Sequence, residues 1–164
     1  MPTGTGERIG SYVLVEPLGF GGQASVWKAR SPTGGFCALK LFGAGVDGAR
    51  ARREAETLKA LSHPCLIAAR SVVVDARGEP LGIELELIEG GSLGTLLGDP
   101  RMTREHRFSA LAQVLAGAAE IHRAGLVHRD IKLENVVVSE RFWSSPADMG
   151  TLKIIDFGIA AAVD

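Results

Sequence analysis

The sequence has few of the features that identify several large classes of protein. Its only two cysteines, Cys37 and Cys65, lie far apart and form no CxxC pattern, so the simplest interpretation is two buried thiols in a reducing cytosol. The formal net charge at pH 7 is −1, so no basic excess suggests nucleic acid or a membrane surface as a partner.

Long apolar runs are also missing. No stretch approaches the length needed to cross a bilayer, and the N-terminus lacks the basic and apolar regions of a signal peptide. We therefore expect a chain without a membrane segment, located in the cytoplasm. With 46% hydrophobic and 23% charged residues, the 164-residue chain can form a core, and we expect one domain or a small lobe joined to part of another.

The first part of the chain, residues 1–88, has the pattern of short strands with one helix. Strand-like runs flank the glycine cluster that follows Phe20, and two further runs surround a turn with Gly78 and Pro80. Residues 47–61 contain helix formers whose apolar spacing predicts an amphipathic helix with one face made of Ala51, Glu54, Leu58 and Leu61.

The second part, residues 89–164, opens with a helix. Thr103 is a suitable N-cap and Gly125 a suitable stop. After this helix, the chain reads as a loop between short strand-like runs. The stripe expected on the helix consists of Phe108, Leu111, Ala112, Leu115, Ala118, Ala119 and His122.

The glycine-rich segment "LGFGGQASVWK" allows three interpretations. It is either a plain hairpin turn or a flexible cover whose backbone N–H groups approach phosphates closely. The third, a dinucleotide-binding fingerprint, requires a helix directly after the loop, and we reject it because "SVWKARS" is strand-like. A Walker A loop is absent because no GK[ST] follows the glycines.

Two charged residues stand at positions that the pattern predicts to be buried. Lys40 lies in the apolar strand "CALKLF", and Glu54 lies on the apolar face of the predicted helix. Each alone is compatible with a snorkelling lysine or a tolerated surface glutamate. Together they favour an ion pair that presents the ammonium group to phosphate oxygens.

The densest polar group of the chain is "VHRDIKLEN", with Asp130, Lys132 and Asn135 in one loop. One acid can accept a hydroxyl proton, the lysine can neutralise phosphoryl charge, and the asparagine can bind a hard cation. Asp156, at the end of a separate strand, supplies a second oxygen ligand of the kind that Mg²⁺ prefers. A solvated charged loop is the alternative interpretation.

In their order along the chain, these segments resemble the eukaryotic-type (Hanks-type) serine/threonine protein kinases. The matching pieces are "LGFGGQASV", "CALK", "RREAETLKALSHP", "ELELIEGGSL", "HRDIKLEN" and "DFG". The resemblance implies an α+β fold, with an antiparallel five-stranded N-lobe containing one helix and the start of a helical C-lobe. It also implies an enzyme that uses ATP and Mg²⁺ to phosphorylate serine and threonine side chains of proteins.

The resemblance also implies a role for each site residue. Lys40 would hold the α- and β-phosphates and pair with Glu54, and Asp130 would position or deprotonate the acceptor hydroxyl. Lys132 has the place typical of serine/threonine kinases, and Asn135 and Asp156 would hold Mg²⁺. Nucleotide-binding positions would be Leu18, Gly19, Gly21, Val26, Ala38 and Lys40, with Leu85 as gatekeeper and the backbone of Glu86 and Ile88 reading adenine.

The sequence departs from the family pattern in several places. Ala24 replaces the third loop glycine, and residues 139–151 lengthen the connection to Asp156 and bring in Phe142 and Trp143, to which we assign no role. His128, by resemblance, supports Phe157. Because the family has an activation segment and further helices after DFG, we expect a catalytic domain truncated shortly after this motif. The absent segment would contact Arg129, and the absent helices would cover part of the stripe that contains Phe108.

Three functions remain open from the sequence. The first is a serine/threonine protein kinase whose front part is this chain. The second is a nucleotide-binding module that does not transfer phosphate, and the third is a kinase of small molecules.

Overall fold

A computed structural model describes residues 4–20, 24–43 and 45–155 of the chain. The chain forms two compact units, which we describe separately: residues 1–60 with 68–87, and residues 61–67 with 88–164. The expected boundary after residue 88 lies one residue from the last junction, between residues 87 and 88. The segment 61–67, expected in the first part, belongs to the second unit, where Cys65 and Ile67 exchange backbone hydrogen bonds with Ile154. Within the described chain, no helix is long and apolar enough to span a membrane.

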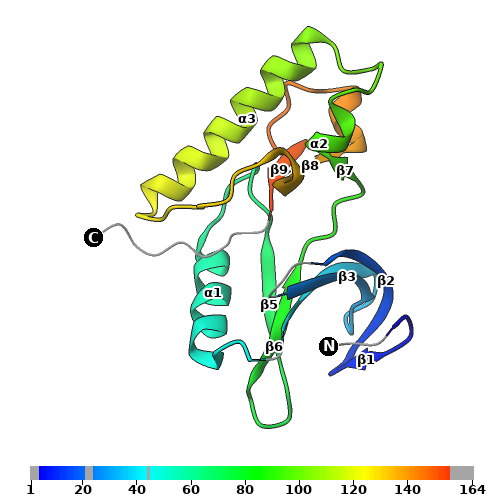
Figure 1. The fold of residues 1–164 in the computed structure, drawn as a ribbon, viewed down its shortest axis with the longest axis vertical. Coiled ribbons are helices and arrows are strands. Elements are labelled where there is room, and N and C mark those ends of the chain that lie inside the picture. The colour runs from blue at the N-terminus through cyan, green and yellow to red at the C-terminus, as the bar shows by residue number, and fades with distance from the viewer. Residues whose placement is uncertain (1–3, 21–23, 44, 156–164) are drawn as a thin grey trace. The chain divides into compact units, whose positions relative to one another are not determined.

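The first unit is a six-stranded antiparallel sheet with one helix, in the order β1-β2-β3-β4-β6-β5 (Figure 1). Five strands agree with the expectation, and the two-residue β1 is an addition. The elements are β1 (Arg8–Ile9), β2 (Tyr12–Phe20), β3 (Ala24–Arg30), β4 (Phe36–Phe42), α1 (Gly48–Ala60), β5 (Ala69–Val74) and β6 (Pro80–Leu85).

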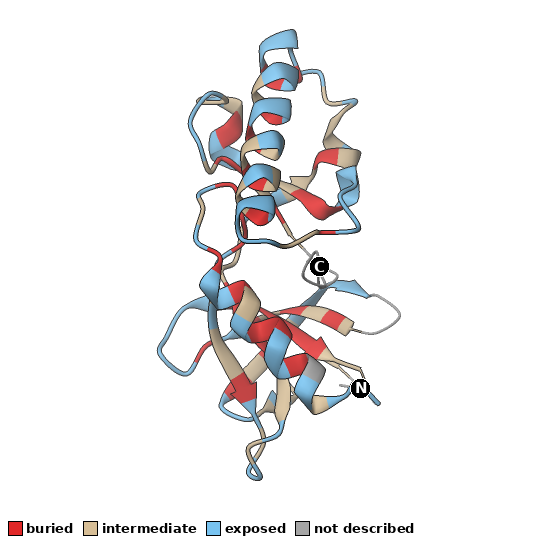
Figure 2. Ribbon diagram, turned by 90° about the vertical axis from the view of Figure 1, so that its left-hand side faces the viewer, coloured by how far each residue is buried: buried red, intermediate tan, exposed pale blue. Residues whose placement is uncertain are grey.

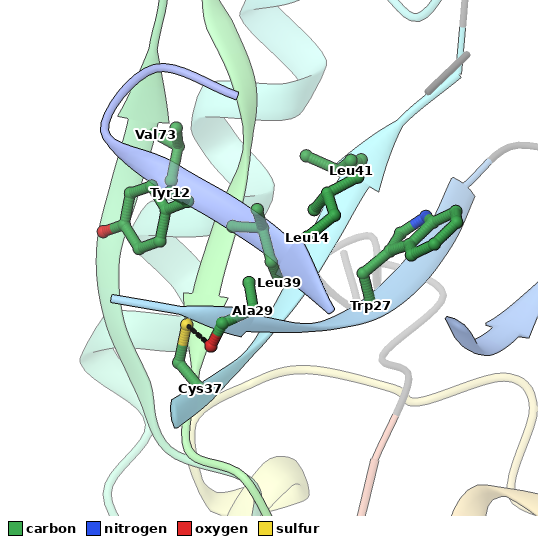
Figure 3. Packing of buried hydrophobic residues seen from close by; sticks show 8 residues of the cluster. All are labelled: Tyr12, Leu14, Trp27, Ala29, Cys37, Leu39, Leu41 and Val73. Atoms are coloured by element: carbon green, nitrogen blue, oxygen red, sulfur yellow. Dashed lines mark hydrogen bonds between the residues drawn. The ribbon is translucent and has the colours of Figure 1, made fainter. Parts of the chain in front are cut away.

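The core of this unit lies on one face of the curled sheet, inside the curl. β2 passes across the cluster in Figure 3, so that side chains from strands distant in the sheet meet there. Burying this apolar surface is the main stabilising contribution to the unit. The cluster consists of Tyr12, Leu14, Trp27, Ala29, Cys37, Leu39, Leu41 and Val73.

Helix α1 begins one residue after the expected start and packs against β5 and β6. Asp47 stabilises its first turn, because its carboxylate accepts a hydrogen bond from the Ala49 N–H and its carbonyl accepts one from the Ala51 N–H. Of the predicted face, Ala51, Glu54 and Leu58 are buried on α1, which also buries Ala55. Figure 2 shows this face in red along α1. Leu61 follows the last helical residue, Ala60, and belongs to the second unit.

The second unit combines a long helix with a three-stranded sheet in the order β7-β8-β9. Its core includes Leu93, Met102, Ala110, Val136, Val138, Phe142 and Leu152. The elements are β7 (Gly90–Ser92), α2 (Leu93–Leu96), α3 (Arg104–Arg123), the 3₁₀ helix Leu133–Asn135, β8 (Val136–Ser139), the 3₁₀ helix Glu140–Trp143 and β9 (Leu152–Ile154).

The ends of α3 agree with the sequence, but the face that it buries does not follow the apolar stripe. Thr103 caps the helix through the His106 N–H, and Gly125, with φ of +72°, follows its last turn. Phe108 and Leu115, both in the predicted stripe, are 60% and 59% exposed. The buried face is formed by His106, Ala110, Gln113, Gly117 and Ile121.

The long connection between β8 and β9 is ordered by α3. Phe142 is fully buried, and the rings of Phe142 and Trp143 contact that of His106 at centroid distances of 5.3 and 5.6 Å. The amide of Gln113 donates to the Pro146 carbonyl and the Thr151 hydroxyl and accepts from the N–H groups of Gly150 and Leu152. Phe142 and Trp143 therefore serve the core of this unit.

Candidate active site

The glycine-rich segment joins two strands. Leu18 and Gly19 are exposed near the end of β2, Val26 lies in β3 opposite Gly19, and Gly21 falls outside the described residues. A strand and not a helix follows the loop, which confirms that the segment is no dinucleotide-binding fingerprint.

One face of the sheet collects the other strand residues expected to bind nucleotide. Val26 is opposite Lys40, and Ala38 is opposite Leu85, so these four side chains share the face that is turned away from the core cluster. Ala38, Lys40 and Leu85 are buried, and Val26 is half-buried.

The expected ion pair between Lys40 and Glu54 is present. The Lys40 Nζ atom lies 2.7 Å from Glu54 Oε1, and the two side chains are only 9% and 10% exposed. Lys40 comes from β4 and Glu54 from the buried face of α1, so the helix and the sheet face meet at this pair. Attraction between the buried ammonium and the buried carboxylate offsets much of the desolvation penalty of the two charges.

The chain at the end of β6 is held against the start of β5. The Glu86 N–H donates to the Ala68 carbonyl at 2.9 Å, and a carboxylate oxygen of Glu86 accepts the Ala68 N–H at 2.8 Å. Leu85 precedes this double contact, whose geometry fixes the backbone of Glu86. Ile88 belongs to the second unit and is half-buried there.

In the second unit, the predicted polar loop places three residues around one carboxylate. Oδ2 of Asp130 accepts hydrogen bonds from Lys132 Nζ and Asn135 Nδ2, both at 2.9 Å. Asn135 also donates to the Asp130 carbonyl at 2.9 Å. Within the described part of the chain, Oδ1 of Asp130 receives no hydrogen bond, so it remains an acceptor toward solvent.

The electrostatics of the loop favour the charged form of this acid. Its hydrogen bond from Lys132 is the main cause that lowers the pKa of Asp130 below its ordinary value of 3.8, with a smaller contribution from the hydrogen bond of Asn135. Asp130 is therefore a carboxylate at neutral pH.

His128 and Arg129 set the backbone on which Asp130 stands. His128 is fully buried, and its Nδ1 accepts the Asp130 N–H at 3.2 Å, so in the neutral ring Nε2 carries the proton and donates to the Ile155 carbonyl at 3.2 Å. Arg129 has φ of +66°, a left-handed conformation that is costly for a residue with a side chain. This conformation turns the chain between a buried histidine and an exposed aspartate, and no pattern in the sequence predicted it. The expected support of Phe157 by His128 falls outside the described residues.

Of the two predicted metal ligands, Asn135 is described, and its backbone bonds to the residue before Asp156. Asn135 accepts the Ile155 N–H at 2.8 Å through its carbonyl oxygen, and Ile155 immediately precedes Asp156, which lies outside the described residues. The side-chain N–H groups of Asn135 are directed to Asp130. The side-chain oxygen of Asn135 is therefore available to bind a cation. An amide oxygen and a carboxylate fit a hard cation such as Mg²⁺. Among the described residues, no group of three or more histidine, cysteine or acidic side chains forms a metal cage.

The similarity to known proteins covers nearly the whole chain and not only the site residues. The family model described as the protein kinase domain matches residues 12–164. The chain is 33% identical to the serine/threonine-protein kinase PkaB of Streptomyces coelicolor, over 96% of this chain and 39% of that protein. It is 35% identical to the serine/threonine-protein kinase PknL of Mycobacterium bovis, over 93% of this chain and 37% of that protein.

A third relative is the serine/threonine-protein kinase pkn2 of Myxococcus xanthus, 32% identical over 94% of this chain and 19% of that protein. The chain thus spans less than half the length of each of these relatives. The family match covers all the motifs of the sequence, including the strand that leads to Asp156. This chain therefore belongs to the protein kinase family.

Proposed function

We propose that this chain supplies the phosphate-transfer site of a serine/threonine protein kinase, which moves the γ-phosphate of ATP to protein hydroxyl groups. The observation that carries the proposal is the Asp130 carboxylate, whose Oδ2 is fixed by Lys132 and Asn135. A carboxylate fixed through one oxygen can use the other to orient an acceptor hydroxyl and to accept its proton. Lys132 and the names of the relatives support a serine or threonine acceptor.

The remaining residues hold the nucleotide in this proposal. Lys40, oriented by Glu54, contacts the α- and β-phosphates. Backbone groups of Glu86 and Ile88 bind the adenine ring through hydrogen bonds. The positions around the nucleotide are Leu18, Gly19, Gly21, Val26, Ala38 and Leu85.

Asn135 and Asp156 are the proposed ligands of Mg²⁺. When bound there, Mg²⁺ would neutralise negative charge on the phosphate oxygens. Lys132, which is hydrogen-bonded to Asp130, would stabilise the phosphoryl group as it approaches the acceptor. The depressed pKa of Asp130 keeps this acid ionised before the hydroxyl proton arrives.

The test is phosphate transfer by the full protein after Asp130→Asn. We expect the rate to fall by a factor of about 10²–10⁴, because positioning and proton acceptance are lost together. Affinity for Mg-ATP should be retained, since Asp130 is not a proposed nucleotide ligand. Asp148→Asn is the matched control, because Asp148 is also an exposed, ion-paired aspartate of this unit and lies outside the loop. Equal transfer by Asp130→Asn and wild type would disprove the role of Asp130.

Nucleotide binding is measured separately, through the melting temperature of the chain with and without Mg-ATP. At a ligand concentration of about 100 times Kd, binding stabilises the folded state by about 2.7 kcal/mol. Stabilisation without any transfer by the wild-type protein would favour the non-catalytic nucleotide-binding module. Transfer to free sugars and not to proteins would favour a small-molecule kinase.

A further inference from the structure

A buried carboxylate outside the predicted site lies in the strand that leads to the proposed adenine contact. Glu84, in β6, is opposite Leu39 and therefore projects from the core face of the sheet. Its relative exposure is 7%. A carboxylate on an apolar face is stable only when its oxygens are satisfied, and this one has several partners.

The partners come from three different parts of the first unit. Oε2 of Glu84 accepts hydrogen bonds from the Tyr12 hydroxyl at 2.7 Å and the Ser71 hydroxyl at 2.8 Å, while these two hydroxyls lie 3.2 Å apart. Oε1 accepts the Ser31 hydroxyl at 3.3 Å, and Arg70 Nη1 lies 3.9 Å away. Burial is the main cause that raises the pKa of Tyr12, so its hydroxyl stays protonated and acts as a donor.

The contact with Tyr12 differs from that with Ser71 because it crosses the core. Tyr12 lies in β2, and β3 and β4 stand between β2 and β6 in the sheet. Ser71, in contrast, is on β5 directly opposite Glu84, where the sheet ladder already joins the two strands. The curl of the sheet places the Tyr12 ring within the core cluster (Figure 3), so its hydroxyl reaches a strand that is no sheet neighbour.

The hydrogen bond between Tyr12 and Glu84 matters for β2 because the pairing of β2 with β3 is irregular. The register shifts twice, between Leu14 and Glu16 and between Pro17 and Gly19. β1 pairs with β2 only at Tyr12 and Val13, and residues 16–20 are exposed. The far end of β2, which carries the proposed phosphate cover, thus has few constraints of its own.

We propose that Tyr12 and Glu84 are positioning residues for nucleotide binding. Their buried hydrogen bond fixes β2, which carries Leu18 and Gly19, against β6, which carries Leu85 and leads to Glu86. Loss of the bond lets β2 shift on its irregular ladder and misplaces the backbone that covers the phosphates. Only the expected effect on ATP binding rests on the proposed function. Whether the hydrogen bond holds β2 in place can be tested without nucleotide.

The experiment compares Tyr12→Phe with Ser71→Ala in the full chain. Each variant removes one hydroxyl donor from the same oxygen of Glu84, and both keep the core nearly filled, but only Tyr12→Phe cuts the link to β2. We expect Tyr12→Phe to raise the Kd for Mg-ATP by up to about tenfold, the equivalent of one hydrogen bond to a charged group. For Ser71→Ala we expect less than about a twofold change, because the β5–β6 ladder remains.

Amide hydrogen exchange without nucleotide gives the second measurement. Residues 16–20 should exchange faster in Tyr12→Phe than in wild type, while Ser71→Ala should leave them unchanged. Faster exchange in Tyr12→Phe only, with weaker Mg-ATP binding, supports the proposal. Equal exchange in the two variants overturns it. If wild type itself fails to bind Mg-ATP, the proposed function fails, while the exchange measurement still decides whether Tyr12 and Glu84 position β2.

Discussion

Removing the carboxylate of Glu54 should strongly destabilise the first unit. Lys40 Nζ and Glu54 Oε1 lie 2.7 Å apart, and both side chains are about nine-tenths buried. At an effective dielectric constant of about 20, their attraction is about 6 kcal/mol, much of which offsets the desolvation of the two charges. Glu54→Leu keeps most of the volume but leaves the buried ammonium without this partner, so we expect a loss of about 3–5 kcal/mol.

The assay is urea unfolding followed by the fluorescence of Trp27, which lies in the core of this unit. A Trp143→Phe background removes the tryptophan signal of the second unit. With a slope of about 2 kcal/mol/M, the expected loss moves the urea midpoint down by about 1.5–2.5 M. This shift is large compared with the error of a midpoint, so a single variant gives a clear answer.

Two further variants make the interpretation specific to the buried pair. Lys40→Met combined with Glu54→Leu removes both charges and should recover stability to within about 1 kcal/mol of wild type. Glu16→Gln is the exposed control, because Glu16 and Lys28 form a surface pair at 3.3 Å, and its loss should cost less than about 1 kcal/mol. The reasoning is refuted if Glu54→Leu costs no more than Glu16→Gln, or if the double variant is no more stable than Glu54→Leu.

Three further predictions concern other parts of the chain. Lys132→Met should raise the pKa of Asp130 toward 3.8, measured by NMR titration of its carboxyl carbon, and an unchanged pKa would contradict the assigned cause. Burial raises the pKa of the Cys37 thiol to about 11 and also raises that of Cys65, so iodoacetamide at about pH 8 should alkylate both thiols only in denaturant, as mass spectrometry can show. Phe142→Ala should cost about 3–5 kcal/mol, measured by urea unfolding with Trp143 fluorescence, and a loss below about 1 kcal/mol would mean that residues 139–151 do not support the core.

The parts of the site that the sequence predicted are those governed by local chemistry. Asp130, Lys132 and Asn135 lie so close in sequence that a single loop brings them together. The pair of Lys40 and Glu54 was predictable for a different reason, because two charges at apolar positions each require a partner.

The link between Tyr12 and Glu84 could not be predicted in this way. The two residues lie 72 positions apart, on strands that do not pair, and they meet only because the sheet curls. The amount of curl depends on the bulges of β2 and on side-chain packing, which no periodicity of the sequence encodes. In the sequence, Glu84 is one of several acids in "GIELELIEGG", and nothing distinguishes its environment from that of Glu86.

Helix α3 shows most clearly where hydrophobic periodicity fails. The apolar stripe predicted the helix, yet the buried face contains Gln113 and Gly117. A Cβ atom on Gly117 would lie 3.0 Å from Ile154 Cδ1 and 3.2 Å from the Cys65 carbonyl, so the helix lies very close to β9 and the adjoining segment. A helix that approaches so closely needs small residues and side chains that satisfy backbone groups, and Gln113 bonds to the N–H groups of Gly150 and Leu152. Closeness of approach and hydrogen bonding, and not hydrophobicity alone, therefore decide which side of α3 supports the strand that leads to Asp156.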